Sequence, residues 1–276
     1  ERQWWAEVAG HLSDVEAWRR VFAPSDAAAQ PSPQHQHTAQ VLGQSVEGLS
    51  VLSVVRPRSR CPACGHELHW YENIPVLSWL GLRARCSACG VRISARYPLI
   101  ELATGVLFGA IAWRFGAQPA TLAWCAFGAT LLALALIDWD TSLLPDSVSL
   151  RLLWGGLVAA AVGWTVPLSS ALWGAVAGYL SLWTVYQLFK LATGKEGMGH
   201  GDFKLLAALG AWLGWPMLVP IILAASVIGA AVGIVMKASG QLREGRYVPF
   251  GPFLAGAGLA VMLAGAPRVL ELLGWA

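Results

Sequence analysis

The sequence contains few charged residues: Asp, Glu, Lys and Arg make up only 13% of its 276 residues, against about 25% in a soluble domain. Hydrophobic residues account for 56%, and there are 15 tryptophans. This balance excludes an ordinary soluble domain and indicates a chain that lies largely in a membrane. The net charge of only +3 gives no reason to expect binding to nucleic acid.

Two common signals are also missing. The chain begins at Glu1, with neither an initiator methionine nor a signal peptide, so we expect its natural beginning to be absent. No G-x-G-x-x-G nucleotide-binding pattern occurs, and the sequence therefore assigns no residue to a nucleotide cofactor.

Composition divides the chain into a polar region, residues 1–97, and an apolar region, residues 98–276. Apolar residues recur at helical spacing near the start, which predicts a helix that lies on the membrane surface or packs on the rest of this region. These residues are Trp4, Trp5, Val8, Leu12, Val15 and Trp18. Residues 24–40 are rich in Pro, Ala and Gln and are expected to form a linker or disordered loop.

The apolar region predicts an all-α polytopic membrane fold, because its apolar stretches approach the ~20 residues needed to cross a bilayer. Seven spans are expected, at roughly 98–115, 118–137, 149–166, 171–191, 203–215, 217–237 and 249–267.

Basic residues predict the orientation of these spans. If the spans alternate, almost all Lys and Arg residues fall on one side, which should be cytoplasmic. The opposite side keeps little more than Arg114 and Arg268. The polar region and the loops at 138–148, 192–202 and 238–248 are then all cytoplasmic.

The polar region carries two C-x-x-C pairs, Cys61-Pro-Ala-Cys64 and Cys86-Ser-Ala-Cys89. Each pair can turn two thiolates inward on a tight knuckle, and two knuckles complete a tetrahedral Zn²⁺ site. The rival interpretations are two disulfides or four free thiols, and a cytoplasmic location disfavours disulfides. Because all four positions are filled, the zinc-ribbon-like site should be structural.

Acidic residues stand unexpectedly close to apolar segments. Asp138, Asp140 and Asp146 end the second predicted span, and Asp202 begins the fifth. Helix capping explains Asp146 after Pro145 but not acids at 138 and 202. Two carboxylates from different helices can share a proton, so that one activates water while the other protonates a scissile carbonyl. Such a pair hydrolyses peptides without a metal.

The glycines beside Asp202 support this interpretation. Gly199 and Gly201 flank His200 and would let an extended peptide backbone approach the carboxylate. A G-x-G-D pattern alone is weak, but a second acid at the same membrane face strengthens it.

Three segments together resemble the type IV prepilin peptidases. They are RSRCPACGHELHWYENIPVLSWLGLRARCSACGVRISARYPLIE, IDWDTSLLPD and GMGHGDFKLLAALGAWLGW. The resemblance runs from about residue 51 to the end. It implies a bacterial inner-membrane enzyme with G-x-G-D aspartyl chemistry that removes the leader of type IV prepilins and pseudopilins of type II secretion. The opening ERQWWAE resembles the segment after the family's first membrane helix, which implies a missing eighth span.

Carried over by motif, the family's catalytic aspartates match Asp138 and Asp202. Supporting roles fall to further residues that match these motifs. They are Asp140, Asp146, Lys204 and Glu101. Glu101 could instead simply pair with Arg96, and Lys204 could balance charge near Asp202 or receive an acid of the substrate.

The resemblance also implies a second activity, the transfer of a methyl group from S-adenosylmethionine to the new N-terminal amine, in which the zinc-bearing region takes part. One departure concerns this region: family members commonly have glycine two positions before the third cysteine, where this chain has Ala84. Partners implied are prepilins, pseudopilins and membrane lipid.

Two other classes of function compete with this interpretation. The first is a non-enzymatic zinc-ribbon membrane protein that assembles a secretion system, with acids that merely cap helices. The second is a transporter with intramembrane acids as a relay. The acids cluster at one face and form no path across the bilayer, which disfavours transport.

Overall fold

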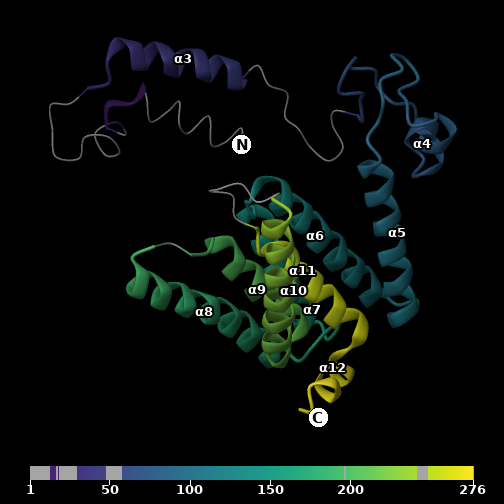
Figure 1. Ribbon diagram of the computed structural model, residues 1–276, viewed down its shortest axis with the longest axis vertical. Helices are drawn as coiled ribbons and strands as arrows, with labels where there is room; N and C mark the ends of the chain where they lie inside the picture. Colours follow the sequence, from purple (N-terminus) through teal and green to yellow (C-terminus); the bar gives the residue numbers. More distant parts are fainter. Residues whose placement is uncertain are drawn as a thin grey trace. The chain divides into compact units, whose positions relative to one another are not determined.

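The computed structural model describes residues 13–16, 18, 30–47, 58–195, 197–240 and 248–275 (Figure 1). The chain divides into two compact units, Glu1–Ser94 and Ala95–Ala276, here called unit 1 and unit 2. Most of the helix expected over residues 4–18 lies outside the described residues.

Unit 1 contains a helix that the composition did not predict. Helix α3 spans Pro33–Glu47, so the expectation of a linker or disordered loop was wrong for residues 33–40. The Ser32 hydroxyl accepts the backbone N–H of His35 at 3.3 Å, and proline occupies the first turn. Both features start helices, and the Gln and Ala residues that follow continue one.

The rest of unit 1 is formed mostly by loops. Its short helices are a 3₁₀ turn η1, Trp70–Asn73, and α4, Leu77–Gly81. The described part of the chain has no β-strand, only two isolated antiparallel bridges, Arg60–Glu67 and Arg85–Arg92. Few of the apolar side chains described in this unit are buried, so burial of apolar surface alone gives it little stabilisation.

Unit 2 is entirely helical in its described residues, and each predicted apolar stretch contains a helix. The helices are α5 (Arg96–Phe115), α6 (Pro119–Thr141), α7 (Asp146–Ala161), α8 (Leu168–Thr193), α9 (His200–Leu213), η2 (Trp215–Met217), α10 (Leu218–Ala238), α11 (Gly251–Ala264) and α12 (Ala266–Leu272). Proline near the start and glycine after the end mark several of their boundaries.

The helical multi-pass membrane fold is confirmed, but the number of seven spans is not. By length and composition α5, α6, α8 and the segment Trp215–Ala238 could each cross a membrane. Helices α11 and α12 would add a fifth span if counted together, although they meet at a bend of 104°. With 16 and 14 residues, α7 and α9 fall short of the ~20 that a full crossing needs.

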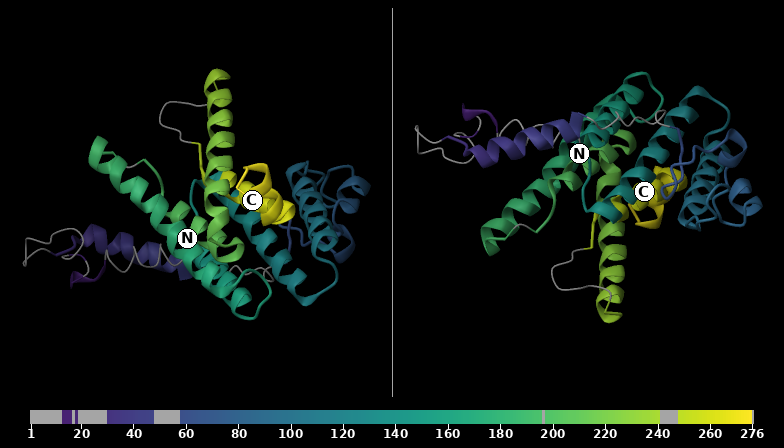
Figure 2. Two further views of the ribbon diagram at one scale, coloured as in Figure 1. Left: turned by 90° about the horizontal axis from the view of Figure 1, so that it is seen from below. Right: turned by 90° about the horizontal axis from the view of Figure 1, so that it is seen from above.

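Helix α9 forms the centre of unit 2. Every residue from Asp202 to Leu213 except Lys204 is buried, and α7, α8 and α11 pack around this helix (Figures 1 and 2). A Cβ atom on Gly210 of α9 would collide with the carbonyl oxygen of Gly174 on α8, and a Cβ atom on Gly178 of α8 would collide with the carbonyl oxygen of Leu206 on α9. Small residues thus let the two backbones touch, as at many membrane-helix interfaces.

The chain reversals bring four helix ends to one end of unit 2. The C-terminal end of α6 meets the N-terminal end of α11, where Asp138 contacts Gly251. The N-terminal ends of α7 and α9 are joined there by Asp146 and Lys204. At the other end, Trp212 donates its indole N–H to the carbonyl of Leu152 at 2.8 Å.

Candidate functional site

Asp138 lies in the last turn of α6 and is only 5% exposed. Its Oδ2 accepts the backbone N–H of Gly251 at 3.1 Å. Gly251 is the first residue of α11, so its N–H has no partner within that helix, and the positive end of the helix dipole faces the carboxylate. A Cβ atom at position 251 would collide with this carboxylate, so glycine is required there.

Asp202 lies in the first turn of α9 and is 8% exposed. The charge of Asp138 acts directly on it, so the fold brings these two acids together across 64 residues of sequence. Leu144 lies against the glycine next to each acid: Cβ atoms at positions 201 and 251 would both meet its side chain. The two carboxylates therefore lie near each other, and both are buried.

Asp140 occupies a different environment from Asp138, two residues away on the same helix. Its carboxylate receives two N–H bonds from Arg96, at 2.9 and 2.5 Å, and its side chain is 43% exposed. It points away from the buried pair, as the helical spacing predicts. Glu101 is exposed on α5, five residues after Arg96. Arg96 thus pairs with Asp140 through two hydrogen bonds, and the sequence did not predict this partner.

Asp146 is not a helix cap, which corrects the simpler interpretation. Pro145 precedes α7, Asp146 is its first residue, and no side-chain cap bond forms. Instead, Lys204 Nζ lies 2.6 Å from both carboxylate oxygens of Asp146. Because Lys204 follows Asp202 by two residues, this ion pair fixes the start of α7 to the start of α9 beside the buried acids.

The two glycines of the G-x-G-D pattern differ in their surroundings. A Cβ atom at Gly201 would collide with Leu144, so this glycine serves helix packing rather than an open approach. A Cβ atom at Gly199 would meet only Asp202 Oδ2, at 4.0 Å. Space for an approaching backbone therefore exists beside Gly199 and not beside Gly201.

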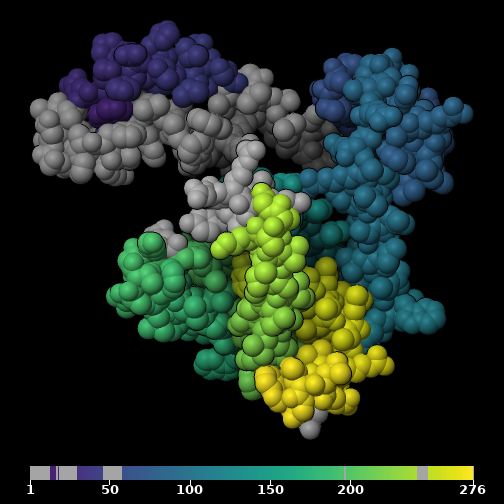
Figure 3. Space-filling view, viewed as in Figure 1, coloured from purple at the N-terminus to yellow at the C-terminus, as the bar shows by residue number. Residues whose placement is uncertain are grey.

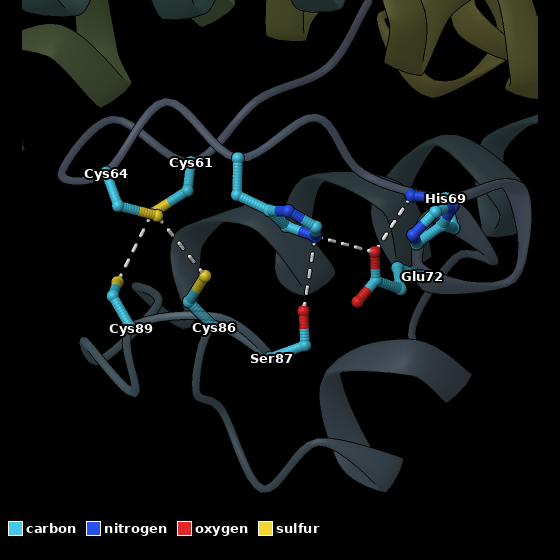
Figure 4. A network of polar contacts seen from close by, with 8 residues as sticks. Cys61, Cys64, His69, Glu72, Cys86, Ser87 and Cys89 are labelled. Atoms are coloured by element: carbon cyan, nitrogen blue, oxygen red, sulfur yellow. Dashed lines mark hydrogen bonds and ion pairs between the residues drawn. The ribbon is translucent and has the colours of Figure 1, made fainter.

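In unit 1 the four paired cysteines point toward a common centre (Figure 4). Cys61 Sγ lies 3.9 Å from Cys89 Sγ, and Cys64 Sγ lies 4.0 Å from Cys86 Sγ. All are free thiols. In a tetrahedral site with Zn–S bonds of about 2.3 Å the sulfur atoms lie about 3.8 Å apart. The four cysteines therefore fit a zinc ion in number, element and spacing.

The two knuckles have matching backbone geometry. Gly65 and Gly90 have φ angles of 72° and 71°, and each donates its N–H to the carbonyl of the first cysteine of its pair. Backbone N–H groups of Cys64 and Ala63 lower the pKa of the Cys61 thiol to about 7, and those of the second knuckle lower the pKa of Cys86. Such N–H groups stabilise the thiolates that bind metal.

A network of polar side chains beside the cysteines was not predicted from the sequence. Glu72 is 7% exposed and accepts the backbone N–H of His69 at 2.8 Å, and His66 Nε2 lies 3.3 Å from its carboxylate. The same ring nitrogen lies 3.4 Å from the hydroxyl of Ser87 (Figure 4). Since His66 follows the first knuckle and Ser87 lies within the second, the network links the two.

Gly251 was also missed by the sequence analysis. A signal existed: the Phe-Gly-Pro-Phe segment follows a polar loop, and proline just inside a helix start is common. That pattern predicts where α11 begins, but it does not predict that the first N–H will meet Asp138.

The fold and the site define a multi-pass helical membrane protein with a buried pair of aspartates and a four-cysteine module. Residues 26–115 match the model of the bacterial peptidase A24 N-terminal domain, and residues 125–234 match that of the type IV leader peptidase family. The chain belongs to the type IV leader peptidase family, and the resemblance described above is confirmed.

Relatives in several bacteria support this assignment. A prepilin leader peptidase/N-methyltransferase of Stutzerimonas stutzeri is 54% identical over 209 residues, covering 76% of this chain and 72% of that protein. The protein of the same name in Pseudomonas aeruginosa is 52% identical, covering 77% and 73% respectively. The one in Aeromonas hydrophila is 44% identical over 265 residues, covering 96% and 82%. No solved structure matches this chain.

Proposed function

We propose that this protein is a membrane-embedded aspartyl endopeptidase that removes the leader peptide of prepilins and pseudopilins and then methylates the exposed N-terminus. The observation that carries the peptidase assignment is the convergence of Asp138 and Asp202 from different helices. Both are buried, and they interact electrostatically. The relatives of this chain share the name prepilin leader peptidase/N-methyltransferase, which supplies the substrate class and the second activity.

The pair would act by sharing one proton. One carboxylate takes a proton from a water molecule, whose oxygen attacks the scissile carbonyl carbon, while the other donates its proton to the carbonyl oxygen. Collapse of the tetrahedral intermediate breaks the C–N bond, and the amine leaves with a proton from the pair. The Gly251 N–H holds one oxygen of Asp138, which fixes this carboxylate and leaves its other oxygen for the exchange.

The other acids and Lys204 would position the pair without taking part in proton transfer. The ion pair of Asp146 and Lys204 holds α7 against α9 next to Asp202. The ion pair of Asp140 and Arg96 holds the end of α6 to the start of α5. Glu101, exposed near this end of α5, would take a supporting role at the same face.

The four cysteines would hold a structural zinc ion, for which the sulfur spacing and the lowered pKa values of the Cys61 and Cys86 thiols provide support. Zinc would supply the cross-link that a loop-rich unit lacks. S-adenosylmethionine would be the methyl donor, as the name of the relatives implies.

The protein would lie in the bacterial inner membrane with the aspartate pair and the zinc-binding unit on the cytoplasmic side. The distribution of Lys and Arg supports this orientation.

The peptidase assignment can be tested with purified protein in detergent and a prepilin, with the products read by mass spectrometry. Loss of mass equal to the leader reports cleavage, and a further methyl group reports transfer. Asp138→Asn and Asp202→Asn should each reduce cleavage by at least about 10³-fold, because a pair that exchanges one proton acts as a unit. Both variants should keep their zinc and their thermal stability.

Asp140→Asn is the matched control, since it makes the same change on an exposed acid two residues from Asp138. It should remain within about fivefold of the wild-type rate, because an exposed ion pair contributes little. Wild-type cleavage by Asp138→Asn together with an inactive Asp140→Asn would show that Asp140 is the catalytic acid. Cleavage by both Asp138→Asn and Asp202→Asn would exclude the aspartyl mechanism.

A further inference from the structure

Two arginines depart from the charge distribution of this protein. If the predicted spans alternate, almost all basic residues fall on the side of the aspartate pair, and Arg114 and Arg268 are the exceptions. Arg114 lies in the last turn of α5, some 18 residues from Arg96, or about 27 Å along a helix. Arg268 lies in α12, beyond the bend that follows α11. Neither contributes to the proposed peptidase site.

The fold brings these two arginines to one cavity. It has a volume of about 610 Å³, and both side chains line it. The remaining lining residues are mostly apolar and come from α5, α11 and α12. They are Ala110, Trp113, Leu263, Ala264 and Pro267. In Figure 3 the α12 segment, in yellow, lies next to the lower end of α5, in teal.

Neither arginine forms an ion pair with an acid in the part of the chain that the structure describes. The guanidinium carbon of Arg114 lies 5.5 Å from the centre of the Phe115 ring. Its guanidinium also lies against Gly265, where a Cβ atom would collide with it. Glycine at the bend between α11 and α12 therefore makes room for this charge. Two guanidinium groups that line one cavity without an acid favour the binding of an anion from outside the chain.

A second cavity adjoins the first through Arg114. It has a volume of about 340 Å³ and includes Trp164 and Thr165 among its lining residues. The Thr165 hydroxyl is buried without a hydrogen-bond partner within the described residues. A buried hydroxyl without a partner is costly. The cavity system thus offers a polar donor in addition to the two arginines.

The surroundings favour a phospholipid over a free anion. The cavity walls are apolar, and Trp113 is 93% exposed, as expected for an aromatic residue at a membrane–water interface. Of the twenty residues of α5 only Pro98 and Ile111 are buried, which leaves an apolar helix surface for an acyl chain. Arginine pairs with a phosphate group through two parallel hydrogen bonds, so two arginines at the edge of an apolar surface suit the headgroup of an anionic phospholipid.

We propose that this cavity binds the phosphate of an anionic phospholipid between Arg114 and Arg268, at the end of unit 2 away from Asp138. The bound lipid joins α5 to α11 and α12, and thereby stabilises a helix that makes few contacts of its own. This site is independent of the peptidase assignment.

Native mass spectrometry of the full chain in mild detergent tests the proposal. Dioleoylphosphatidylglycerol and dioleoylphosphatidylcholine serve as probes, and the variants are Arg114→Gln and Arg268→Gln. Arg151→Gln is the matched control, because Arg151 is an equally exposed arginine on α7 that lines neither cavity. Wild type and the control should retain one phosphatidylglycerol in preference to phosphatidylcholine. Each test variant should bind phosphatidylglycerol about tenfold more weakly.

Thermal unfolding gives a second measurement on the same samples. Phosphatidylglycerol should raise the midpoint for wild type and for Arg151→Gln, but much less for the two test variants. If Arg114→Gln does not fold, Arg268→Gln in the exposed α12 helix and Arg114→Lys still test the site. Equal retention of the two lipids, unchanged binding by the test variants, or displacement by millimolar inorganic phosphate would each overturn the proposal.

Discussion

Glu72 is a buried acid whose hydrogen bonds link the two cysteine knuckles of unit 1. The Ser87 hydroxyl and the His69 N–H lower its pKa from 4.5 to about 2. A carboxylate with a lowered folded-state pKa stabilises the fold above its unfolded-state pKa. That contribution is lost as the pH falls from about 4.5 through 2.

Glu72→Gln should therefore unfold and release zinc at lower temperature than wild type. Between pH 5 and 8 Glu72 is ionised in both the folded and unfolded states, so its own titration adds no pH dependence to the difference in stability there. Thermal unfolding with excess zinc across this range is the measurement, with Glu67→Gln on the exposed bridge as the control. An equal effect of both changes would contradict the role of the network.

Ala84 occupies a backbone conformation that favours glycine. Its φ angle is 59°, and Arg83 before it has a φ angle of 52°. The left-handed region costs a residue with a Cβ atom about 1 kcal/mol. This is the position at which family members commonly have glycine, so the departure has a physical cost that the sequence alone did not reveal.

Ala84→Gly should raise the free energy of unfolding of unit 1 by roughly 0.5–1 kcal/mol, since glycine removes the strain but adds freedom to the unfolded chain. Chemical denaturation followed by zinc release measures this change. Ala88→Gly serves as the control, because Ala88 has no positive φ angle and should lose stability instead. A loss of stability in Ala84→Gly would show that the strain is not the controlling factor.

The choice between Asp138 and Asp140 shows what residue patterns cannot predict. Both acids stand in one motif, and spacing predicts only that they point in different directions. They differ in burial: Asp138 is buried, whereas Asp140 is exposed. The buried carboxylate of Asp138 contacts Gly251, which lies 113 residues later in the chain. By contrast, the four cysteines could be predicted completely, because each knuckle is formed by neighbouring residues and the pairs need only meet.

Among the helices, α9 depends most on its neighbours. Sequence predicted a short fifth span, since its residues 205–213 are apolar on all sides. Such a pattern fits a membrane span and a buried core helix equally well. Contacts with α7, α8 and α11 decide the matter and place α9 inside the bundle. For α3 the sequence predicted a linker where the structure has a helix. Here local capping by Ser32 outweighed a composition typical of linkers.

Gly210→Ala tests the close contact between α8 and α9. The new Cβ atom would overlap the Gly174 carbonyl oxygen, so the two helices must separate, at a cost of about 1–3 kcal/mol. Thermal unfolding in detergent should show the loss, and leader cleavage should fall as well because α9 carries Asp202. Gly256→Ala on α11 is the control: nothing lies within 4 Å of its Cβ position, and it should keep wild-type stability.

For the whole molecule, the ends of four helices meet where the aspartate pair lies, and Ser142 lies in the loop between two of them. Leu168 begins α8 at the opposite end of the bundle and is 49% exposed. The excess of Lys and Arg on the aspartate side predicts that this side is cytoplasmic. The two positions should therefore differ in their access to a reagent that cannot cross the membrane.

Single cysteines introduced by Ser142→Cys and Leu168→Cys can be labelled with an impermeant maleimide in intact cells. The parent protein gives the background from its own cysteines. Leu168→Cys should react from outside, and Ser142→Cys should react only after permeabilisation. Position 142 lies at the same end of unit 2 as Asp138 and Asp202, where the scissile bond of the substrate must bind. Labelling of this position from outside would therefore place cleavage on the outer side of the membrane. It would refute the proposed orientation while leaving the aspartate pair itself intact.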